Sequence, residues 1–228
     1  MDEDRRHRWA IGERAYERHE RRRGRRFVYE ELRPERTALV VVDVVRFFVA
    51  AGPYAASVVP RVRELAGATR AAGGTVAWVL PAVAARPDPW AVEFYGADAA
   101  EAYRRAGGTG TPGERLAPGL VPGPGDAVVE KSAPSAFFPG RCPLPGVLER
   151  RGVDTVVVCG LVTDVCVAAT VRDAATIGYR AVLVADACAT RSDAAHNAVL
   201  ETVYRSFGDV RSTAEVVALL SRGAAGNV

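Results

Sequence analysis

The sequence predicts an α/β fold, with a doubly wound, mainly parallel sheet of six strands between helices on both faces. Two observations predict it. Apolar, β-branched runs recur along the chain, and segments with helical spacing separate them. The runs also lack the polar alternation of strands that face water on one side. At 228 residues, the chain has room for one full domain of this kind but not comfortably for two.

The elements follow in an alternating order. The first strand is expected at Thr37–Asp43 (TALVVVD), and the helix after it at Val59–Ala72, before the stop signal Gly73-Gly74. The other strands are shorter apolar runs, expected at Thr75–Leu80, Ala127–Glu130, Thr155–Cys159, Ala181–Ala185 and Asp209–Arg211. The other helices are expected at Pro143–Arg151, Asp164–Ile177 and Asp193–Phe207, with a last helix capped by Ser212 or Thr213.

Two regions stand apart from this alternation. Residues 1–36 form an arginine-rich N-terminal arm, which precedes a domain spanning residues 37–228. Within the domain, segment 81–124 is long, rich in proline and glycine, and carries Trp90, Phe94 and Tyr95. We expect this insertion to form a lid or pocket wall over one end of the sheet, with contact between subunits as the alternative.

The composition is that of an ordinary globular protein, with 49% hydrophobic and 25% charged residues. No apolar run is long enough to span a bilayer, and the first residues lack the apolar core of a signal peptide. We therefore expect a cytoplasmic protein without a membrane partner. The four cysteines show no CxxC pairing, which argues against a zinc ribbon, and free thiols are expected in a reducing compartment.

Three reactive side chains are expected at one edge of the sheet, where parallel strands end and ligands bind. Asp43 closes the first strand, Lys131 follows the third, and Cys166 lies just beyond the fourth. Lys131 is also the only lysine among 30 basic residues, and an ammonium has a pKa that its surroundings can shift, unlike a guanidinium. Each residue has a plain alternative: a surface lysine, an aspartate that caps a helix, or a cysteine that packs in the core.

Cys166 is expected in the first turn of a helix. Thr163 would be the N-cap and Asp164 the first helical residue, so the helix N-terminus would favour a thiolate at Cys166. Asp43 would accept the thiol proton, Lys131 would hold both charges, and backbone amides would stabilise an oxyanion. These are the parts of acyl transfer through a thioester.

On these residues the chain resembles the isochorismatase-like cysteine hydrolases, which include N-carbamoylsarcosine amidohydrolase, nicotinamidases and ureidoacrylate hydrolases. The resemblance runs from Thr37 to about Leu219 and leaves out the arm. The matching segments are ALVVVDVVRFFV around Asp43, EKSAPSAFF around Lys131, GLVTDVCVAATVRDAATIGYR around Cys166, and VLVADACATRSDAAHNAVL after it.

The resemblance implies more than the residues do. It implies that Asp43, Lys131 and Cys166 form a catalytic triad, and that the bond between Leu161 and Val162 is a cis peptide. The backbone amides of Val162 and Cys166 would then form the oxyanion hole. It further implies an isochorismatase-like hydrolase domain over 37–228, no cofactor, and a homo-oligomer, either a dimer or a tetramer.

Two departures from relatives bear on the substrate. Metal-dependent nicotinamidases carry an Asp-x-His…His site near the second strand, whereas the only histidines here are His7, His19 and His196, so no metal is expected. Arg46 replaces a glutamine or asparagine common in relatives; it would bind a substrate carboxylate or lie on the surface. His196 would line the pocket or cap a helix. The candidates for substrate contact are Arg46, Phe48, Trp90, Tyr95, Ser135 and Phe137.

The arm is expected to form a helix over Arg5–Arg26. Its arginines suggest nucleic-acid binding, but Glu13, Glu17 and Glu20 interleave with them as on a solvated helix. Trp9 and Ile11 favour packing on a neighbouring subunit, so no nucleic-acid partner is expected.

The sequence thus predicts a metal-independent amidohydrolase that cleaves a C–N bond in a small amide, ureide or carbamoyl compound. One alternative is an isochorismatase-type hydrolase of a vinyl ether, which needs no cysteine nucleophile. The other is a catalytically silent relative that serves in binding or assembly.

Overall fold

Six parallel strands form a single sheet in the order β3-β2-β1-β4-β5-β6. The computed structural model describes residues 6–225. The strands are β1 (Thr37–Val42), β2 (Thr75–Pro81), β3 (Ala127–Lys131), β4 (Thr155–Leu161), β5 (Arg180–Ala189) and β6 (Asp209–Arg211). The strand order reverses between β1 and β4, which are neighbours, so the crevice where such sheets bind ligands lies between their carboxyl ends.

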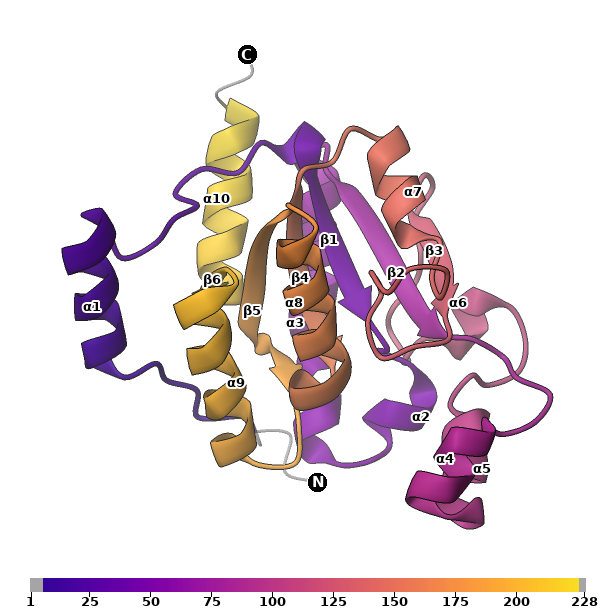
Figure 1. The fold of residues 1–228 in the computed structure, drawn as a ribbon. Coiled ribbons are helices and arrows are strands. Elements are labelled where there is room, and N and C mark those ends of the chain that lie inside the picture. Colours follow the sequence, from indigo (N-terminus) through magenta and orange to yellow (C-terminus); the bar gives the residue numbers. More distant parts are fainter. Residues whose placement is uncertain (1–5, 226–228) are drawn as a thin grey trace.

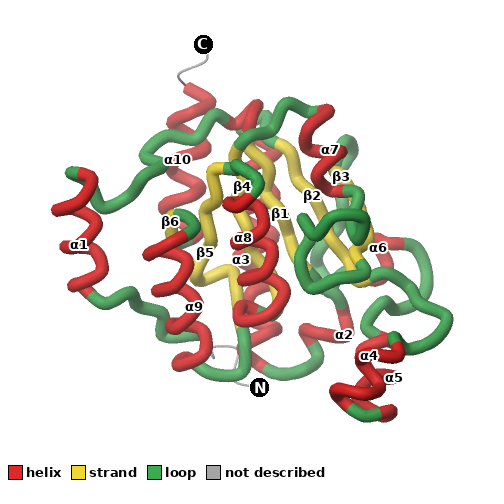
Figure 2. Tube along the Cα trace, in the orientation of Figure 1, coloured by secondary structure: helices red, strands yellow, loops and turns green. Residues whose placement is uncertain are grey.

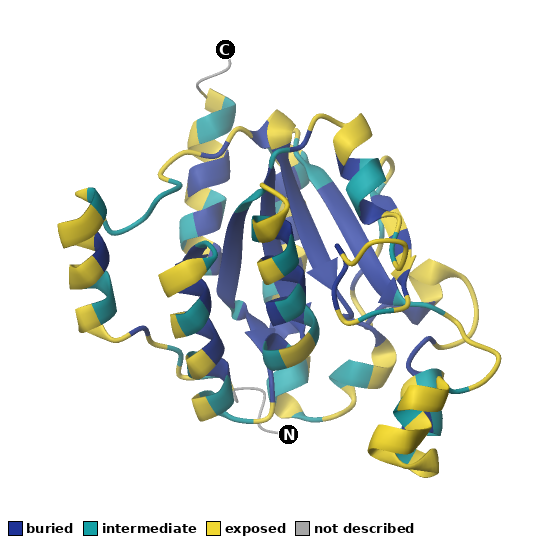
Figure 3. Cartoon of the chain, in the orientation of Figure 1, coloured by how far each residue is buried: buried dark blue, intermediate teal, exposed yellow. Residues whose placement is uncertain are grey.

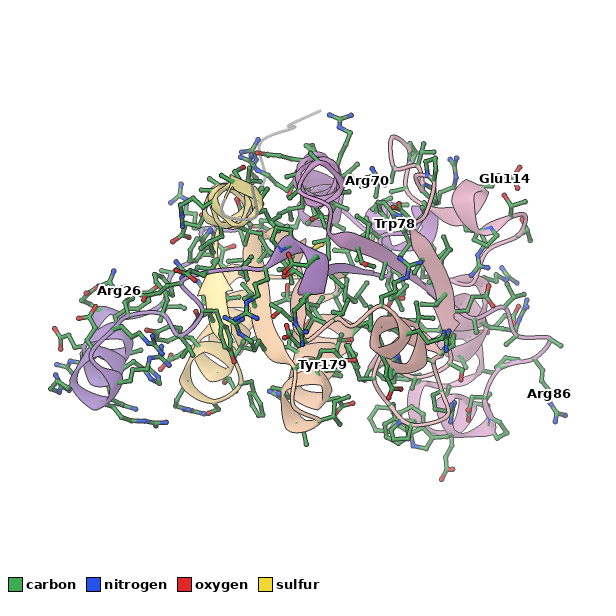
Figure 4. The ribbon with its side chains drawn as sticks, turned by 90° about the horizontal axis from the view of Figure 1, so that it is seen from above. Arg26, Arg70, Trp78, Arg86, Glu114 and Tyr179 are labelled. Carbon is green, nitrogen blue, oxygen red and sulfur yellow. The ribbon has the colours of Figure 1, made fainter. Side chains whose placement is uncertain are left out.

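Helices cover both faces of the sheet and complete the predicted three layers (Figures 1 and 4). One face carries α3 (Pro53–Ala71) and α10 (Thr213–Ala225); the other carries α7 (Leu144–Arg150), α8 (Ala168–Thr176) and α9 (Asp193–Ser206). The strands between them are almost entirely buried (Figure 3), as continuous apolar runs require. Within residues 6–225, no helix is long and apolar enough to cross a membrane.

One helix begins earlier than predicted. The helix expected at Val59–Ala72 begins at Pro53, six residues upstream. Pro53 takes the first helical position, where a proline loses no hydrogen bond, and Gly52 precedes it. Pro60 lies inside the helix, where a proline is unfavourable. Proline is common at the first position of a helix, so Pro60 made the helix look as if it began near residue 60.

Segment 81–124 holds three short helices, of which the first two protrude beside the carboxyl edge of the sheet (Figures 1 and 2). They are α4 (Pro89–Tyr95), α5 (Ala97–Arg105) and α6 (Pro112–Arg115). Another short helix, α2 (Arg46–Val49), lies between β1 and α3. The sequence patterns did not predict these four helices, which have four to nine residues and few buried side chains to form a repeating apolar face.

The N-terminal arm packs along α9 of its own chain (Figure 1). Its helix, α1 (Glu13–Arg23), is shorter than the predicted Arg5–Arg26, and residues 1–5 lie outside the described part. A 3₁₀ turn, η1 (Pro34–Arg36), joins the arm to β1. The carboxylate of Asp209 accepts hydrogen bonds from the Val28 and Tyr29 amides, at 2.9 and 2.8 Å. The predicted contact with a neighbouring subunit stays a prediction.

Candidate active site

The structure brings Asp43, Lys131 and Cys166 together at the carboxyl edge of the sheet. Asp43 follows β1, Lys131 ends β3, and Cys166 lies in a π-helical turn, η2 (Thr163–Val167), directly after β4. The Lys131 ammonium nitrogen Nζ is 2.7 Å from Oδ2 of Asp43. The Cys166 thiol lies close enough to both partners for the three groups to shift one another's pKa. The place is the predicted one, beside the reversal between β1 and β4.

The backbone of Asp43 adopts the left-handed conformation, with φ of 54°. Aspartate and asparagine tolerate this conformation better than other residues with a side chain do. The Asp43 amide donates to the Val79 carbonyl at 2.9 Å, and the Asp43 carbonyl accepts from the Val45 amide at 2.8 Å. The carboxylate therefore leaves the end of β1 from a backbone that is fixed on both sides.

Burial governs the electrostatics of the three residues. The side chain of Asp43 is 1% exposed and that of Lys131 is 4% exposed. Burial raises the pKa of Asp43, although the Lys131 charge opposes the shift. Burial alone would lower the pKa of Lys131, but Asp43 and Cys166 reverse this and raise it. Asp43 is therefore a stronger base than a solvent-exposed aspartate, beside a cation that stays charged.

Cys166 rests as a thiol, which corrects the thiolate expected at this position. Burial, followed by the negative charge of Asp43, raises the pKa of Cys166 to about 12, against the opposing charge of Lys131. Cys166 lies in a five-residue π-helical turn, and the cost of removing its charged form from water outweighs any stabilisation from the partial positive charge at the start of that turn. The thiol consequently needs a base when it reacts, and Asp43 is in place for that role.

The turn that carries Cys166 differs from the predicted helix start. Val162, not Thr163, occupies the N-cap position, so the Thr163 prediction is wrong. The Thr163 hydroxyl is buried and lies 2.9 Å from Nδ1 of His196, which leaves it no role as a cap. The Val162 carbonyl accepts from the amides of Val165 and Val167, both at 3.2 Å. The bond between Leu161 and Val162 is cis.

Hydrogen bonds within the loop after Lys131 shape it and tie it to α8. The Ser135 hydroxyl accepts from the Phe137 amide at 3.0 Å, and the Ala136 amide donates to the Thr170 hydroxyl of α8 at 3.1 Å. The Phe137 ring is buried, 5.2 Å from the ring of Tyr179 (labelled in Figure 4). Ser135 and Phe137, proposed as substrate contacts, therefore hold the loop and pack in the core.

The remaining substrate candidates occupy two places. Arg46 is exposed at the start of α2, and its Nε donates to the Glu114 carbonyl at 2.8 Å; Phe48 is half-buried against the core. Trp90 and Tyr95 are exposed on α4, and their rings pack against each other with centroids 5.6 Å apart. Arg46 and Phe48 follow Asp43 closely, whereas α4 stands on the protruding insertion (Figure 1).

The three histidines do not form a metal site with other described residues. The rings of His7 and His196 stack with centroids 4.5 Å apart, and His19 lies against Tyr204. Within residues 6–225, no group of three or more His, Cys, Asp or Glu side chains is arranged to hold a metal ion. The predicted cap role of His196 is wrong, because the Ser192 hydroxyl caps α9 by accepting from the Ala195 amide.

Sequence reasoning missed two contacts that support the catalytic turn. One is the contact of His196 with Thr163, and the other is the hydrogen bond from the Thr190 hydroxyl to Oδ1 of Asp164, at 2.6 Å. The partners are 33 and 26 residues apart in the chain. Contacts between elements at such separations leave no spacing pattern in a single sequence.

Comparison with known proteins agrees with this architecture. A family model for the isochorismatase domain matches residues 37–215. Ureidoacrylate amidohydrolase RutB of Methylobacterium radiotolerans is 31% identical over 222 residues, covering 86% of this chain and 84% of the relative.

Two solved structures share the fold. A cysteine hydrolase from Pseudomonas syringae pv. phaseolicola has a TM-score of 0.76 at 28% identity, covering 86% of this chain and 98% of the other. N-carbamoylsarcosine amidase from Thermoplasma acidophilum has a TM-score of 0.63 at 31% identity, covering 78% and 96%. The chain with its Asp43–Lys131–Cys166 site thus belongs to the isochorismatase family.

Proposed function

We propose that this chain is a metal-independent amidohydrolase that cleaves a C–N bond in a small amide, ureide or carbamoyl compound through a thioester on Cys166. The single observation that carries the proposal is the buried ion pair between Lys131 and Asp43 within reach of a thiol that rests protonated. Such a thiol becomes a nucleophile only if a nearby group accepts its proton, and Asp43 is that group.

The first half of the reaction forms the acyl-enzyme. The sulfur of Cys166 attacks the substrate carbonyl carbon while its proton passes to Asp43. The oxygen of the tetrahedral intermediate takes hydrogen bonds from the backbone amides of Val162 and Cys166, which are the proposed oxyanion hole. The C–N bond then breaks, and the leaving ammonia or amine takes the proton from Asp43.

The second half releases the product. Asp43 accepts a proton from a water molecule, and the resulting hydroxyl attacks the thioester carbonyl. The intermediate collapses, the C–S bond breaks, and the proton held by Asp43 returns to the sulfur of Cys166. Lys131 remains protonated throughout, because its pKa is raised beside Asp43. It supplies a fixed positive charge that stabilises the carboxylate between proton transfers.

The relatives support the choice of substrate class. One is named a ureidoacrylate amidohydrolase and another an N-carbamoylsarcosine amidase, and both names describe hydrolysis of a compound with a ureido or carbamoyl group. The proposed reaction needs no metal, because Asp43 supplies the base and Lys131 the fixed positive charge.

A screen for ammonia release tests the proposal. The purified chain is offered ureides, carbamoyl amino acids and primary amides, with Cys166→Ala as the blank and Cys142→Ala as the matched control. Cys142 is also partly buried, and it lies in the loop that follows Lys131. We expect turnover by the wild type and Cys142→Ala but not by Cys166→Ala. Equal turnover by Cys166→Ala would reject the thioester mechanism.

A further inference from the structure

The N-terminal arm reaches the catalytic edge of the sheet through His7. The side chain of His7 is 2% exposed, although it belongs to a segment that sequence patterns place outside the domain. Its Nδ1 lies 2.6 Å from Oδ1 of Asp193, the first residue of α9. Its Nε2 lies 3.0 Å from both the amide nitrogen and the carbonyl oxygen of Thr190, directly after β5. His7 is therefore inserted between two elements of the domain.

The hydrogen bonds define what the His7 ring does. Nδ1 donates to the Asp193 carboxylate, and this bond lowers the pKa of Asp193. Nε2 faces both the amide and the carbonyl of Thr190, so the tautomer and charge of the ring set whether it accepts from the one or donates to the other. His7 thus supplies a hydrogen-bonding partner for the backbone at the end of β5.

Two contacts continue from His7 to the catalytic turn. Thr190, which His7 fixes by its backbone, donates from its hydroxyl to Asp164 at 2.6 Å. The His7 ring also stacks on His196 at 4.5 Å, and Nδ1 of His196 lies 2.9 Å from the Thr163 hydroxyl. Thr163 and Asp164 are the first two residues of the turn Thr163–Val167 that carries Cys166. On its other face, the His7 ring stacks on Tyr54 of α3 at 4.2 Å.

We propose that His7 is a positioning residue: it holds Thr190 and His196 so that Thr163 and Asp164 keep the Cys166 thiol aimed at Asp43. The inference rests on the proposed function of Cys166. The arm is anchored independently through Asp209, which binds the Val28 and Tyr29 amides. A change at His7 therefore acts on the catalytic turn without releasing the arm.

Two substitutions separate the hydrogen bond from the stacked ring, in the full-length chain. His7→Phe keeps a ring between Tyr54 and His196 but has no hydrogen-bonding partner for the Thr190 backbone. His7→Gln lacks the ring but offers an amide group to the same backbone. Thr190→Val removes only the hydroxyl that reaches Asp164. The matched control is Asn197→Ala, because Asn197 binds the arm at the Ala10 amide and the Arg8 carbonyl, at 3.0 and 3.1 Å.

We expect His7→Phe and Thr190→Val to lower kcat by about 10- to 100-fold with KM little changed, because the nucleophile is displaced rather than the substrate site. His7→Gln should recover most of kcat, and Asn197→Ala should keep it within about twofold of the wild type. Cys166 should react faster with iodoacetamide in His7→Phe than in Asn197→Ala, at equal melting temperatures, because a loosened turn encloses the sulfur less.

The outcomes distinguish the two proposals. If Cys166→Ala turns over substrate like the wild type, the proposed function fails. If Cys166→Ala is inactive while His7→Phe and Thr190→Val match Asn197→Ala in kcat, the positioning role alone is overturned. Equal iodoacetamide rates in His7→Phe and Asn197→Ala would overturn it as well, and this measurement needs no substrate.

Discussion

Asp43 combines a strained backbone, a buried charge and a proton-acceptor role in one residue. Its φ of 54° is left-handed, its side chain is enclosed, and its carboxylate contacts Lys131 at 2.7 Å. A non-glycine residue in this conformation costs free energy, which functional sites retain where the geometry serves them. Here the geometry turns the carboxylate from the end of β1 toward the thiol of the turn after β4.

Asp43→Asn tests the role of the carboxylate without changing the backbone, since asparagine tolerates the same left-handed conformation. We expect kcat to fall by about 10²- to 10⁴-fold, the usual contribution of a general base. The pKa of Cys166 should fall, because Asp43 raises it and Lys131 remains. The pH profile of iodoacetamide labelling measures this shift, with the exposed Asp98→Asn as control. Unchanged kcat, or a labelling profile displaced to higher pH, would contradict the account.

At the residue scale, the sequence was sufficient for the three reactive side chains. Their strands are apolar runs with clear ends, and the carboxyl ends of parallel strands share one edge. It was insufficient for the protonation state of Cys166, which depends on how completely the sulfur is enclosed. Thr163 shows the same limit: threonine is a common N-cap, but its hydroxyl is taken by His196, a residue of another element.

Beside the site, β1 and β4 lie so close together that only a glycine fits at residue 160 of β4. Gly160 has a φ of 124°, and a Cβ added there would lie 2.0 Å from the Val42 carbonyl oxygen of β1. No side chain fits this approach without moving β1, which leads into Asp43, or β4, which leads into the turn of Cys166. The glycine thus sets the distance between β1 and β4 at the catalytic edge.

Gly160→Ala should lower the free energy of unfolding by about 3 kcal/mol or more, since it combines a backbone clash with an unfavourable φ. Gly67→Ala is the control: Gly67 lies inside α3, and a Cβ there meets nothing within 4 Å. That change should stabilise the chain by about 0.5–1 kcal/mol. Urea denaturation measures both. A Gly160→Ala protein as stable as the wild type would show that β1 and β4 are not held this closely.

His196 links the stability of α9 and the catalytic turn to pH. Burial, followed by the charge of His7, lowers the pKa of His196 from 6.5 to about 4. The unfolded chain therefore binds a proton at this residue below pH 6.5, while the folded chain binds it only near pH 4. Stability should fall as the pH drops through this window, by about 3 kcal/mol in total.

His196→Asn supplies the comparison, because asparagine is similar in size near the backbone and does not titrate. Denaturation in urea across the same pH window gives the slope of the unfolding free energy against pH. This slope should be smaller in the variant, by up to the amount that corresponds to one bound proton. An identical slope in both proteins would mean that His196 titrates alike in the folded and unfolded states.

At the element scale, prediction from the sequence succeeded for strands and helices that bury apolar side chains in a regular pattern. The six strands and the helices after β1, β3, β4, β5 and β6 were found because each has a long apolar face or an apolar run. The start of α3 was misplaced because Pro60 lies inside the helix. The short helices of the insertion were missed because their residues are mostly exposed (Figure 3).

The whole molecule is a domain with an arm wrapped along one side. Arg26 of the arm and Arg86 of the insertion mark its opposite ends (Figure 4). The sequence set the arm apart by its charge, but it did not reveal that the arm packs on α9. Asp209 and its partners Val28 and Tyr29 are about 180 residues apart, so only the folded chain brings them together.

Asp209→Asn tests this docking. The buried carboxylate accepts two backbone amides, and the amide group of asparagine would place a donor against one of them. We expect a loss of about 2 kcal/mol in the free energy of unfolding, together with faster proteolysis within residues 13–36. The exposed Asp98→Asn is again the control. Unchanged stability and unchanged proteolysis would show that Asp209 does not hold the arm.

The central claim is that Cys166 forms the covalent intermediate, and mass spectrometry tests it most directly. A substrate found in the ammonia-release screen is mixed with enzyme, the reaction is quenched in acid during turnover, and the peptides are mapped. We predict an added acyl mass on the peptide that contains Cys166, present in the wild type and absent in Cys166→Ala. Full turnover by Cys166→Ala, with no added mass on the wild-type peptide, would contradict the account.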